Sequence, residues 1–148
     1  MTVRVTLGPG GPVREVPTGT PAAELAADPS FPRTRLPLVA LLANNEVVST
    51  AHPLVVNTLL APVDLASRAG VGIYRKSLCF LLAMAARRVF PKRRLVIGHS
   101  LGHSYLYWFD GMEEVPDADL ARIKAQMQEL VTRDLPIRSL LLSYTEAV

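Results

Sequence analysis

The sequence has a single cysteine, Cys79, among its 148 residues. One thiol excludes an internal disulfide and suits a reducing compartment, so we expect a cytoplasmic protein. The N-terminus lacks the basic-then-apolar pattern of a signal peptide. The apolar run Leu78–Ala86 is far shorter than the roughly 20 residues that cross a bilayer, and Arg87 and Arg88 close it. The sequence therefore predicts a protein without a membrane segment.

Two phosphate-binding motifs are also missing. No G-x-x-x-x-G-K-[ST] pattern occurs, which excludes a Walker-type loop from these residues, and no G-x-G-x-x-G stands between a strand and a helix. The sequence has no internal repeat and no low-complexity tract. Hydrophobic residues make up 49%, enough to form a packed core, and the net charge of +3 permits a nucleic acid partner without arguing for one.

The first 60 residues follow the order strand, strand, helix, strand, strand, with apolar alternation in the strands and turn residues between them. The pair Asn44-Asn45 tolerates positive φ and predicts a turn. This order is that of the ubiquitin-like β-grasp plan, and we expect residues 1–65 to form one domain. The expected elements are strands at Val3–Leu7 and Val13–Val16, a helix at Ala22–Ala27 capped by Thr20, and strands at Arg35–Leu42 and Glu46–Ser49.

Residues 70–148 are expected to form a second α+β unit, which follows a linker at Ala61–Gly72. The fold class predicted for the whole chain is α+β. A strand placed against the end of the chain without a partner indicates a domain truncated at its C-terminus. The expected elements are a long helix from Ile73 to about Phe90, strands at Arg94–Ile97 and Tyr105–Phe109, a helix at Asp117–Arg133, and a last strand at Ile137–Leu142.

The segment Gly98–Gly102 reads Gly-His-Ser-Leu-Gly and matches G-x-S-x-G, the nucleophile elbow of α/β-hydrolases. An elbow needs a helix after the serine, and an acid and a histidine further along the chain. Here the following residues alternate like a strand, and the only later histidine, His103, lies one residue past the motif. The pattern therefore favours a structural β-turn over a hydrolase.

His99 and His103 form H-x-x-x-H, a spacing that places two imidazoles on one side of a helix and suits zinc. Gly98 and Gly102 favour a loop or hairpin instead, and no third ligand stands out. We therefore expect ordinary histidines and no metal site.

Five cations span the end of the long helix and the next turn: Arg87, Arg88, Lys92, Arg93 and Arg94. Cations near a helix C-terminus complement the helix dipole, which is the favoured explanation. A phosphate or RNA contact is the alternative.

Four aromatic residues lie close together further along the chain: Tyr105, Tyr107, Trp108 and Phe109. Their imperfect alternation favours core and sheet-surface positions over a platform on which bases stack.

The stretch Tyr74–Ala83 resembles the helix that opens the second additional domain of threonyl-tRNA synthetases, where an H-S-x-x-H-L-L-A type pattern is typical. The first 60 residues resemble the TGS domain that precedes it. The resemblance covers nearly the whole chain, and it implies a TGS-like β-grasp domain followed by part of an editing-like α+β domain. It continues, in order, through Arg88-Val89-Phe90-Pro91, Ile97-Gly98, Tyr105–Gly111 and Met127–Ile137.

One departure from that family concerns its chemistry. The two helix histidines of the family fall at Lys76 and Phe80. An ammonium group and a phenyl ring cannot replace two imidazoles as zinc ligands or as groups that handle a mischarged ester. The resemblance therefore implies that editing by this constellation is absent, and we expect no catalytic residue and no metal ligand.

The segments Tyr74–Leu78 and Gly98–Gly102 look closer to a second family, the bacterial uridine-kinase-like nucleoside kinases. Those proteins carry a TGS domain and a synthetase-like domain ahead of a P-loop kinase domain. The resemblance implies a parent that phosphorylates a nucleoside, with ATP and Mg²⁺ bound by a kinase domain absent from this sequence. That C-terminal domain is then the expected partner, and oligomers are possible.

The function expected from the sequence is an accessory, regulatory or ligand-binding role in such a nucleoside kinase. We hypothesise a shared cleft that holds a nucleotide or RNA phosphate, with cations as charge partners and histidines as donors. One alternative is a threonyl-tRNA synthetase-like editing or tRNA-binding fragment, and another is a pure interaction module that dimerises or docks the parent. The candidate ligand-binding residues are Arg75, Lys76, His99, His103 and Asp110.

Overall fold

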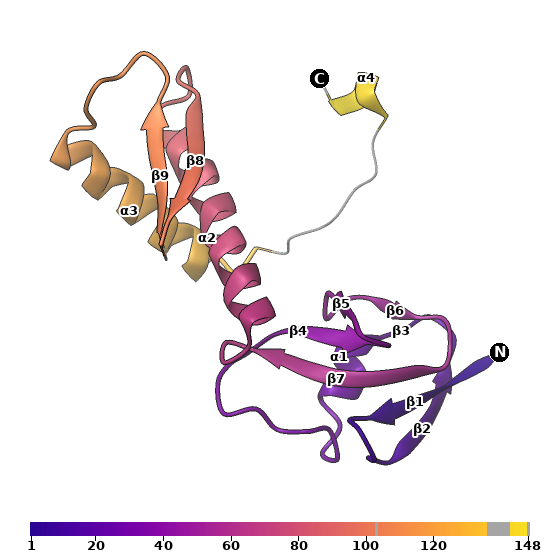
Figure 1. Ribbon diagram of the computed structural model, residues 1–148. Coiled ribbons are helices and arrows are strands. Elements are labelled where there is room, and N and C mark those ends of the chain that lie inside the picture. Colours follow the sequence, from indigo (N-terminus) through magenta and orange to yellow (C-terminus); the bar gives the residue numbers. More distant parts are fainter. Residues whose placement is uncertain (103, 136–142, 148) are drawn as a thin grey trace. The chain divides into compact units, whose positions relative to one another are not determined.

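The computed structural model describes residues 1–102, 104–135 and 143–147. It divides into two compact units, Met1–Ser77 and Leu78–Val148, and the boundary falls inside the longest helix, α2 (Figure 1). Each unit has its own hydrophobic core. Sheets and helices are mixed along the chain, which confirms the α+β fold class.

The first unit is built on a five-stranded mixed sheet with the strand order β2-β1-β7-β4-β5. Strands β1 and β7 are parallel, and every other neighbouring pair in this sheet is antiparallel. A short helix, α1, completes the predicted order of two strands, a helix and two further strands, and the structure adds β7 and a small sheet of β3 and β6 that the sequence did not predict. The elements are β1 (Thr2–Leu7), β2 (Val13–Pro17), β3 (Thr20–Pro21), α1 (Ala22–Ala26), β4 (Leu38–Ala43), β5 (Glu46–Val48), β6 (Pro53–Leu54) and β7 (Thr58–Asp64).

The core of the first unit lies on one face of this sheet. Alternate residues of β1 point into it, as the sequence alternation predicts, because successive side chains of a strand face opposite sides. Val5, Leu41 and Leu60 come from three adjacent strands and are fully buried. They pack with Leu25 of α1 and with Phe31, which follows it.

The predicted linker at Ala61–Gly72 is wrong. Strand β7 occupies Thr58–Asp64 in the middle of the sheet, and α2 begins at Arg68. Ser67 caps this helix, since the amide of Gly70 donates to its Oγ at 3.0 Å. A Cβ at Gly70 would lie 1.9 Å from the carbonyl oxygen of Asp64, so glycine here permits a close approach between helix and strand rather than flexibility.

The predicted cap of α1 is also wrong. Thr20 lies in β3, and its hydroxyl donates to the carbonyl oxygen of Pro17 at 2.8 Å. The N-cap residue is Pro21, which makes no side-chain capping bond.

An ion pair joins β2 to the segment after α1 and gives the first unit a predictable pH dependence. Arg14 Nε donates to Asp28 Oδ2 at 2.9 Å, and the amide of Ser30 donates to Oδ1 at 2.8 Å. These bonds, the Arg14 bond foremost, lower the pKa of Asp28 from 3.8 to about 2. A carboxyl whose pKa is lowered by folding contributes its full stabilisation above the pKa that it has in the unfolded chain. This contribution should therefore be lost as pH falls from about 4 to about 2.

We expect an NMR titration of the Asp28 carboxyl to show a midpoint near pH 2. Asp28→Asn should reduce the fall in unfolding free energy over that pH window. A midpoint at the ordinary value near 3.8 would contradict the geometry of the pair.

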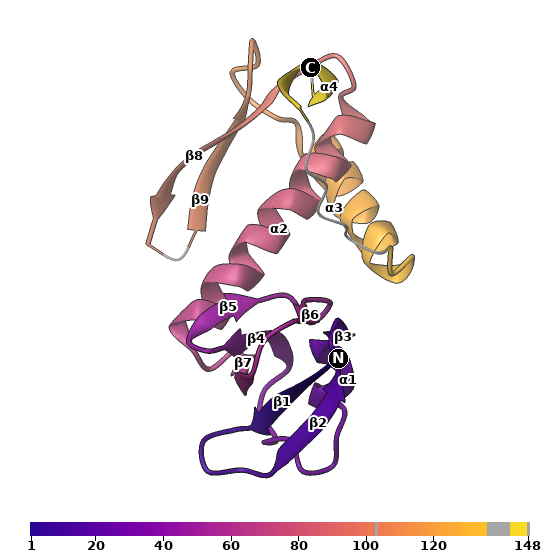
Figure 2. The same ribbon diagram turned by 90° about the vertical axis from the view of Figure 1, so that its right-hand side faces the viewer.

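The second unit packs a β-hairpin against two helices. Helix α2 (Arg68–Val89) leads into strands β8 (Leu95–Leu101) and β9 (Ser104–Phe109), followed by α3 (Asp117–Thr132) and the single turn α4 (Tyr144–Ala147). Figure 2 shows α2 and α3 on the same side of the hairpin. Phe109 of β9 is buried there, and its ring meets Phe90 edge-on with centroids 4.8 Å apart. The core also includes Ala85, Ala86, Ile123 and Leu130.

The structure confirms the predicted strand at Tyr105–Phe109 and helix α3 to within a residue. The predicted turn at Gly98–Gly102 is wrong, because β8 continues from Leu95 to Leu101. The predicted strand at Ile137–Leu142 lies outside the described residues, and so does His103.

Helix α2 is longer than the apolar run from which the sequence predicted that no segment crosses a membrane. By length and composition alone it can cross a membrane, with a mean hydropathy of 1.3 over 18 residues, of which only 17% are buried. One such helix is weak evidence. Arg75 and Lys76 lie near its middle, where each charge opposes insertion by about 2.5–3.5 kcal/mol. Ala85 and Ala86 are buried in the core of the second unit, so its C-terminal end packs against protein.

Candidate functional site

A hollow of about 440 Å³ lies where α2, the turn after it and β8 meet in the second unit. Four of the residues that line it are cationic. We call them the hollow cations: Arg87, Lys92, Arg93 and Arg94. The other described residues that line it are Ala83 and Leu95, so none of the described lining residues is a carboxylate.

The hollow cations differ from other cations of the chain in their partners. Within the described residues, none of the four forms an ion pair with a carboxylate. Four arginines elsewhere do form such pairs: Arg14, Arg88, Arg122 and Arg133. Like charges gathered without counter-charges repel one another, so the arrangement favours an anionic ligand.

Arg93 is fixed in place by the end of the hairpin. Its Nη1 donates to the carbonyl oxygens of Asp110 at 3.4 Å and Gly111 at 2.9 Å. The guanidinium has five N–H donors, and the groups on Nε and Nη2 make no hydrogen bond to any described residue. A preorganised guanidinium with free donors suits a phosphate or carboxylate oxygen.

The helix dipole explains only part of this cluster. Its effect falls off within the last turn, and α2 ends at Val89. Arg87 lies in that turn, whereas the other hollow cations lie beyond it. The dipole therefore leaves most of the charge in the hollow unexplained.

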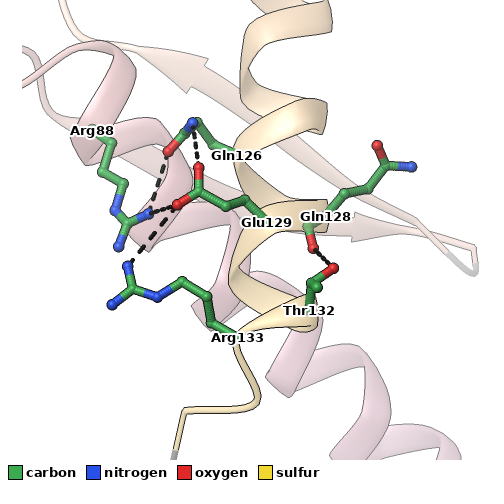
Figure 3. A network of polar contacts seen from close by, with 6 residues as sticks. All are labelled: Arg88, Gln126, Gln128, Glu129, Thr132 and Arg133. Carbon is green, nitrogen blue, oxygen red and sulfur yellow. Dashed lines mark hydrogen bonds and ion pairs between the residues drawn. The ribbon is translucent and has the colours of Figure 1, made fainter.

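Arg88, the neighbour of Arg87, has a different role. Its Nη1 donates to Gln126 Oε1 at 3.3 Å and lies 3.5 Å from Glu129 Oε1 on α3 (Figure 3). Arg133 approaches the same Glu129 oxygen at 4.0 Å. This network joins α2 to α3, so Arg88 has a structural partner that Arg87 lacks.

Four of the five candidate residues predicted from the sequence are described, and none of these four lines the hollow. Arg75 is partly buried and Lys76 is exposed on α2, while His99 and Asp110 are exposed at the hairpin and His103 is outside the described residues. The amide of Asp110 donates to Arg94 O at 2.9 Å at the open end of the hairpin. His99 is five residues further along β8, or roughly 16 Å at 3.3 Å per residue, so the register separates it from Asp110.

The Gly98–Gly102 segment is a strand with an irregularity, and not a strand-to-helix elbow. The pairing of β8 with β9 shifts between Ile97 and Ser100, and strand β9 follows the segment. Gly102 has a φ of 57°, which suits glycine at the turn. The described residues of this segment therefore do not form the strand-to-helix turn of a nucleophile elbow. Among the described residues, no three His, Cys, Asp or Glu side chains lie together as a metal site requires.

No family model matches the chain. A threonine–tRNA ligase of Desulforamulus reducens is 32% identical over 146 residues, which is 99% of this chain and 23% of the relative. One from Carboxydothermus hydrogenoformans is 31% identical over 140 residues, 95% of this chain and 22% of the relative. One from Thermobifida fusca is 34% identical over 130 residues, 87% of this chain and 18% of the relative.

The chain thus spans less than a quarter of the length of these relatives. The matched part is their N-terminal region, which confirms the resemblance to threonyl-tRNA synthetases. The predicted uridine-kinase parentage is not supported, because the relatives named above are ligases.

Proposed function

We propose, on the premise that the chain is homologous to the N-terminal region of threonyl-tRNA synthetases, that it is an accessory module that contacts tRNA and performs no editing chemistry. In this proposal the hollow cations hold phosphates of the RNA backbone. The observation that supports it is the gathering around one hollow of four cations that form no ion pair with any described residue. Phosphate contacts supply most of the affinity of such complexes and position the partner without reading its sequence.

Salt dependence tests this proposal. Each neutralised phosphate contributes about 0.7 to 0.9 to the slope of log affinity against log salt. Four hollow cations therefore predict a slope of about −3. We expect fluorescence polarisation with labelled tRNA to show this slope between roughly 50 and 200 mM salt. Absence of binding at the lowest salt, or affinity independent of salt, would remove the proposal.

The absence of editing chemistry follows from two positions on α2. Lys76 and Phe80 stand where the resembling family has its helix histidines, and both are exposed. Lysine binds zinc only after it loses its proton, and phenylalanine has no donor atom. We expect no acceleration of the hydrolysis of a mischarged seryl-tRNA by the purified chain with added zinc. Release of serine above the uncatalysed rate would overturn this part of the proposal.

The other functions expected from the sequence are either unsupported by the relatives or untested. An accessory role in a nucleoside kinase has no support among the relatives named above, and we do not propose it. A pure interaction module and an oligomeric assembly stay predictions, as does the shared cleft near Lys76 and His99. A module that contacts tRNA would act where tRNA is charged, which agrees with the expected cytoplasmic location.

A further inference from the structure

The hollow has the volume of a site for one small ligand. Its volume of about 440 Å³ falls within the roughly 300–1,000 Å³ of small-molecule pockets. A protein that follows a single strand instead presents a positive groove for about 4–16 nucleotides. The described lining residues come from positions 83 to 95 alone, at the end of α2, in the turn after it and at the start of β8. The hollow therefore suits the end of an RNA strand better than a long run of its backbone.

The positive charge around the hollow is dense for its volume. Four cations line it, and none of them pairs with a described carboxylate. A phosphate inside a strand carries a single negative charge, whereas a terminal phosphomonoester carries about −1.5 to −2 at pH 7 and has three free oxygens. Because Coulomb attraction scales with the product of the charges, the terminal group gains more from such a cluster.

Arg93 presents two donors side by side. Its Nη1 is held by the carbonyl oxygens of Asp110 at 3.4 Å and Gly111 at 2.9 Å. Gly111 has a φ of 69°, a conformation that glycine adopts without strain. The groups on Nε and Nη2 share one edge of the planar guanidinium and make no hydrogen bond to any described residue. Such an edge binds two oxygens of one phosphate at once.

The third oxygen distinguishes a terminal phosphate from an internal one. Once Arg93 has bound two oxygens, a terminal phosphate keeps a third for Arg87, Lys92 or Arg94. An internal phosphate has only two non-bridging oxygens, and the arginine edge uses both. The terminal group can therefore make at least one more charge-assisted hydrogen bond in this hollow.

We propose that the hollow binds the terminal phosphomonoester of an RNA strand, with Arg93 as its bidentate partner and the other hollow cations around the third oxygen. On a tRNA this group is the 5′ phosphate, because the 3′ end is a free hydroxyl. The inference rests on the proposed function and identifies one of the phosphates that the hollow cations hold. Ala83 and Leu95 add an apolar wall that the terminal nucleoside contacts and that a free phosphate ion leaves uncovered.

Three forms of one tRNA test this inference on the unchanged protein. They carry a 5′ phosphate, a 5′ methylphosphate with one charge fewer, or a 5′ hydroxyl, and each has the same fluorescent label at its 3′ end. One further hydrogen bond to a charged group corresponds to roughly 10- to 150-fold in affinity. We expect fluorescence polarisation to show that the phosphorylated form binds at least about 10-fold more tightly than the hydroxyl form, with the methylated form between them.

Substitution of Arg93 by lysine tests the bidentate contact, because lysine keeps the charge but has no fork of donors. Arg93→Lys should lower the preference for the phosphorylated over the hydroxyl form to below about 3-fold. This preference is a ratio measured within one variant, so a general loss of affinity cancels. Arg88→Lys is the matched control and should keep the preference, because Arg88 lies against Glu129 and does not line the hollow.

The possible outcomes separate this inference from the proposed function. If the hydroxyl or the methylated form binds as tightly as the phosphorylated form while the salt slope is present, the inference alone is overturned. Equal affinity for a free 5′ mononucleotide and for the phosphorylated tRNA also overturns it, since the hollow would then be a site for small nucleotides. Absence of binding by all three forms overturns the inference together with the proposed function.

Discussion

Replacing Arg87, Lys92 and Arg94 together with glutamine should weaken tRNA binding by roughly 150-fold. This number takes about 1 kcal/mol for each phosphate contact, below the range given for hydrogen bonds to charged groups, and about 3 kcal/mol in total. The salt slope should shrink by about 2 to 3. All three side chains are exposed and without ion pairs to described residues, so unfolding free energy should change little.

The neighbouring arginines of α2 provide a matched control. Arg87→Gln and Arg88→Gln remove the same charge from the same helical turn, yet only Arg87 lines the hollow. Arg88 instead lies against Glu129. We expect Arg87→Gln to weaken tRNA binding about fivefold and Arg88→Gln to have a smaller effect. Equal effects of the two substitutions would mean that general charge, and not the hollow, attracts the RNA.

Phe109→Ala should destabilise the second unit by about 3–5 kcal/mol. The side chain is 4% exposed, packs edge-on against Phe90, and joins the hairpin to the cores of α2 and α3. Its loss leaves a cavity between the hairpin and the two helices. Urea unfolding followed by the fluorescence of Trp108 measures the effect, because this single tryptophan reports on the hairpin next to the substitution.

Leu106→Ala is the control for this substitution. It lies on the same strand, is 42% exposed, and should cost less than about 1 kcal/mol. A loss below about 1 kcal/mol in Phe109→Ala would show that the hairpin is not held by the core that the structure assigns to it.

Local chemistry let the sequence predict much of the fold. The alternation of Val3, Val5 and Leu7 identifies β1, and the apolar spacing over Asp117–Thr132 identifies α3, because each pattern depends only on the period of its own element. The pair Asn44-Asn45 adopts positive φ values of 49° and 70°, as its tolerance of that conformation predicts. These features need no knowledge of what packs against them.

Long-range pairing decided what the sequence could not. Pro62 and Gly70 suggested a linker, yet β7 lies in the sheet because β1 and β4 pair with its two edges, and Gly70 serves close packing. The sequence likewise left open whether the aromatic residues are core or surface. The structure places Phe109 in the core and leaves Trp108 44% exposed, with its ring close to Gly98.

The hollow, too, was predictable from the sequence only in part. Its cations are close in the sequence, and their number and type were evident there. Arg87 and Arg88 are adjacent residues of the same type, and no local sequence rule predicts which of them lines the hollow. Only the packing of α3 against α2 brings Glu129 to Arg88 and leaves Arg87 facing the hollow, because a partner 41 residues away is fixed by tertiary structure alone.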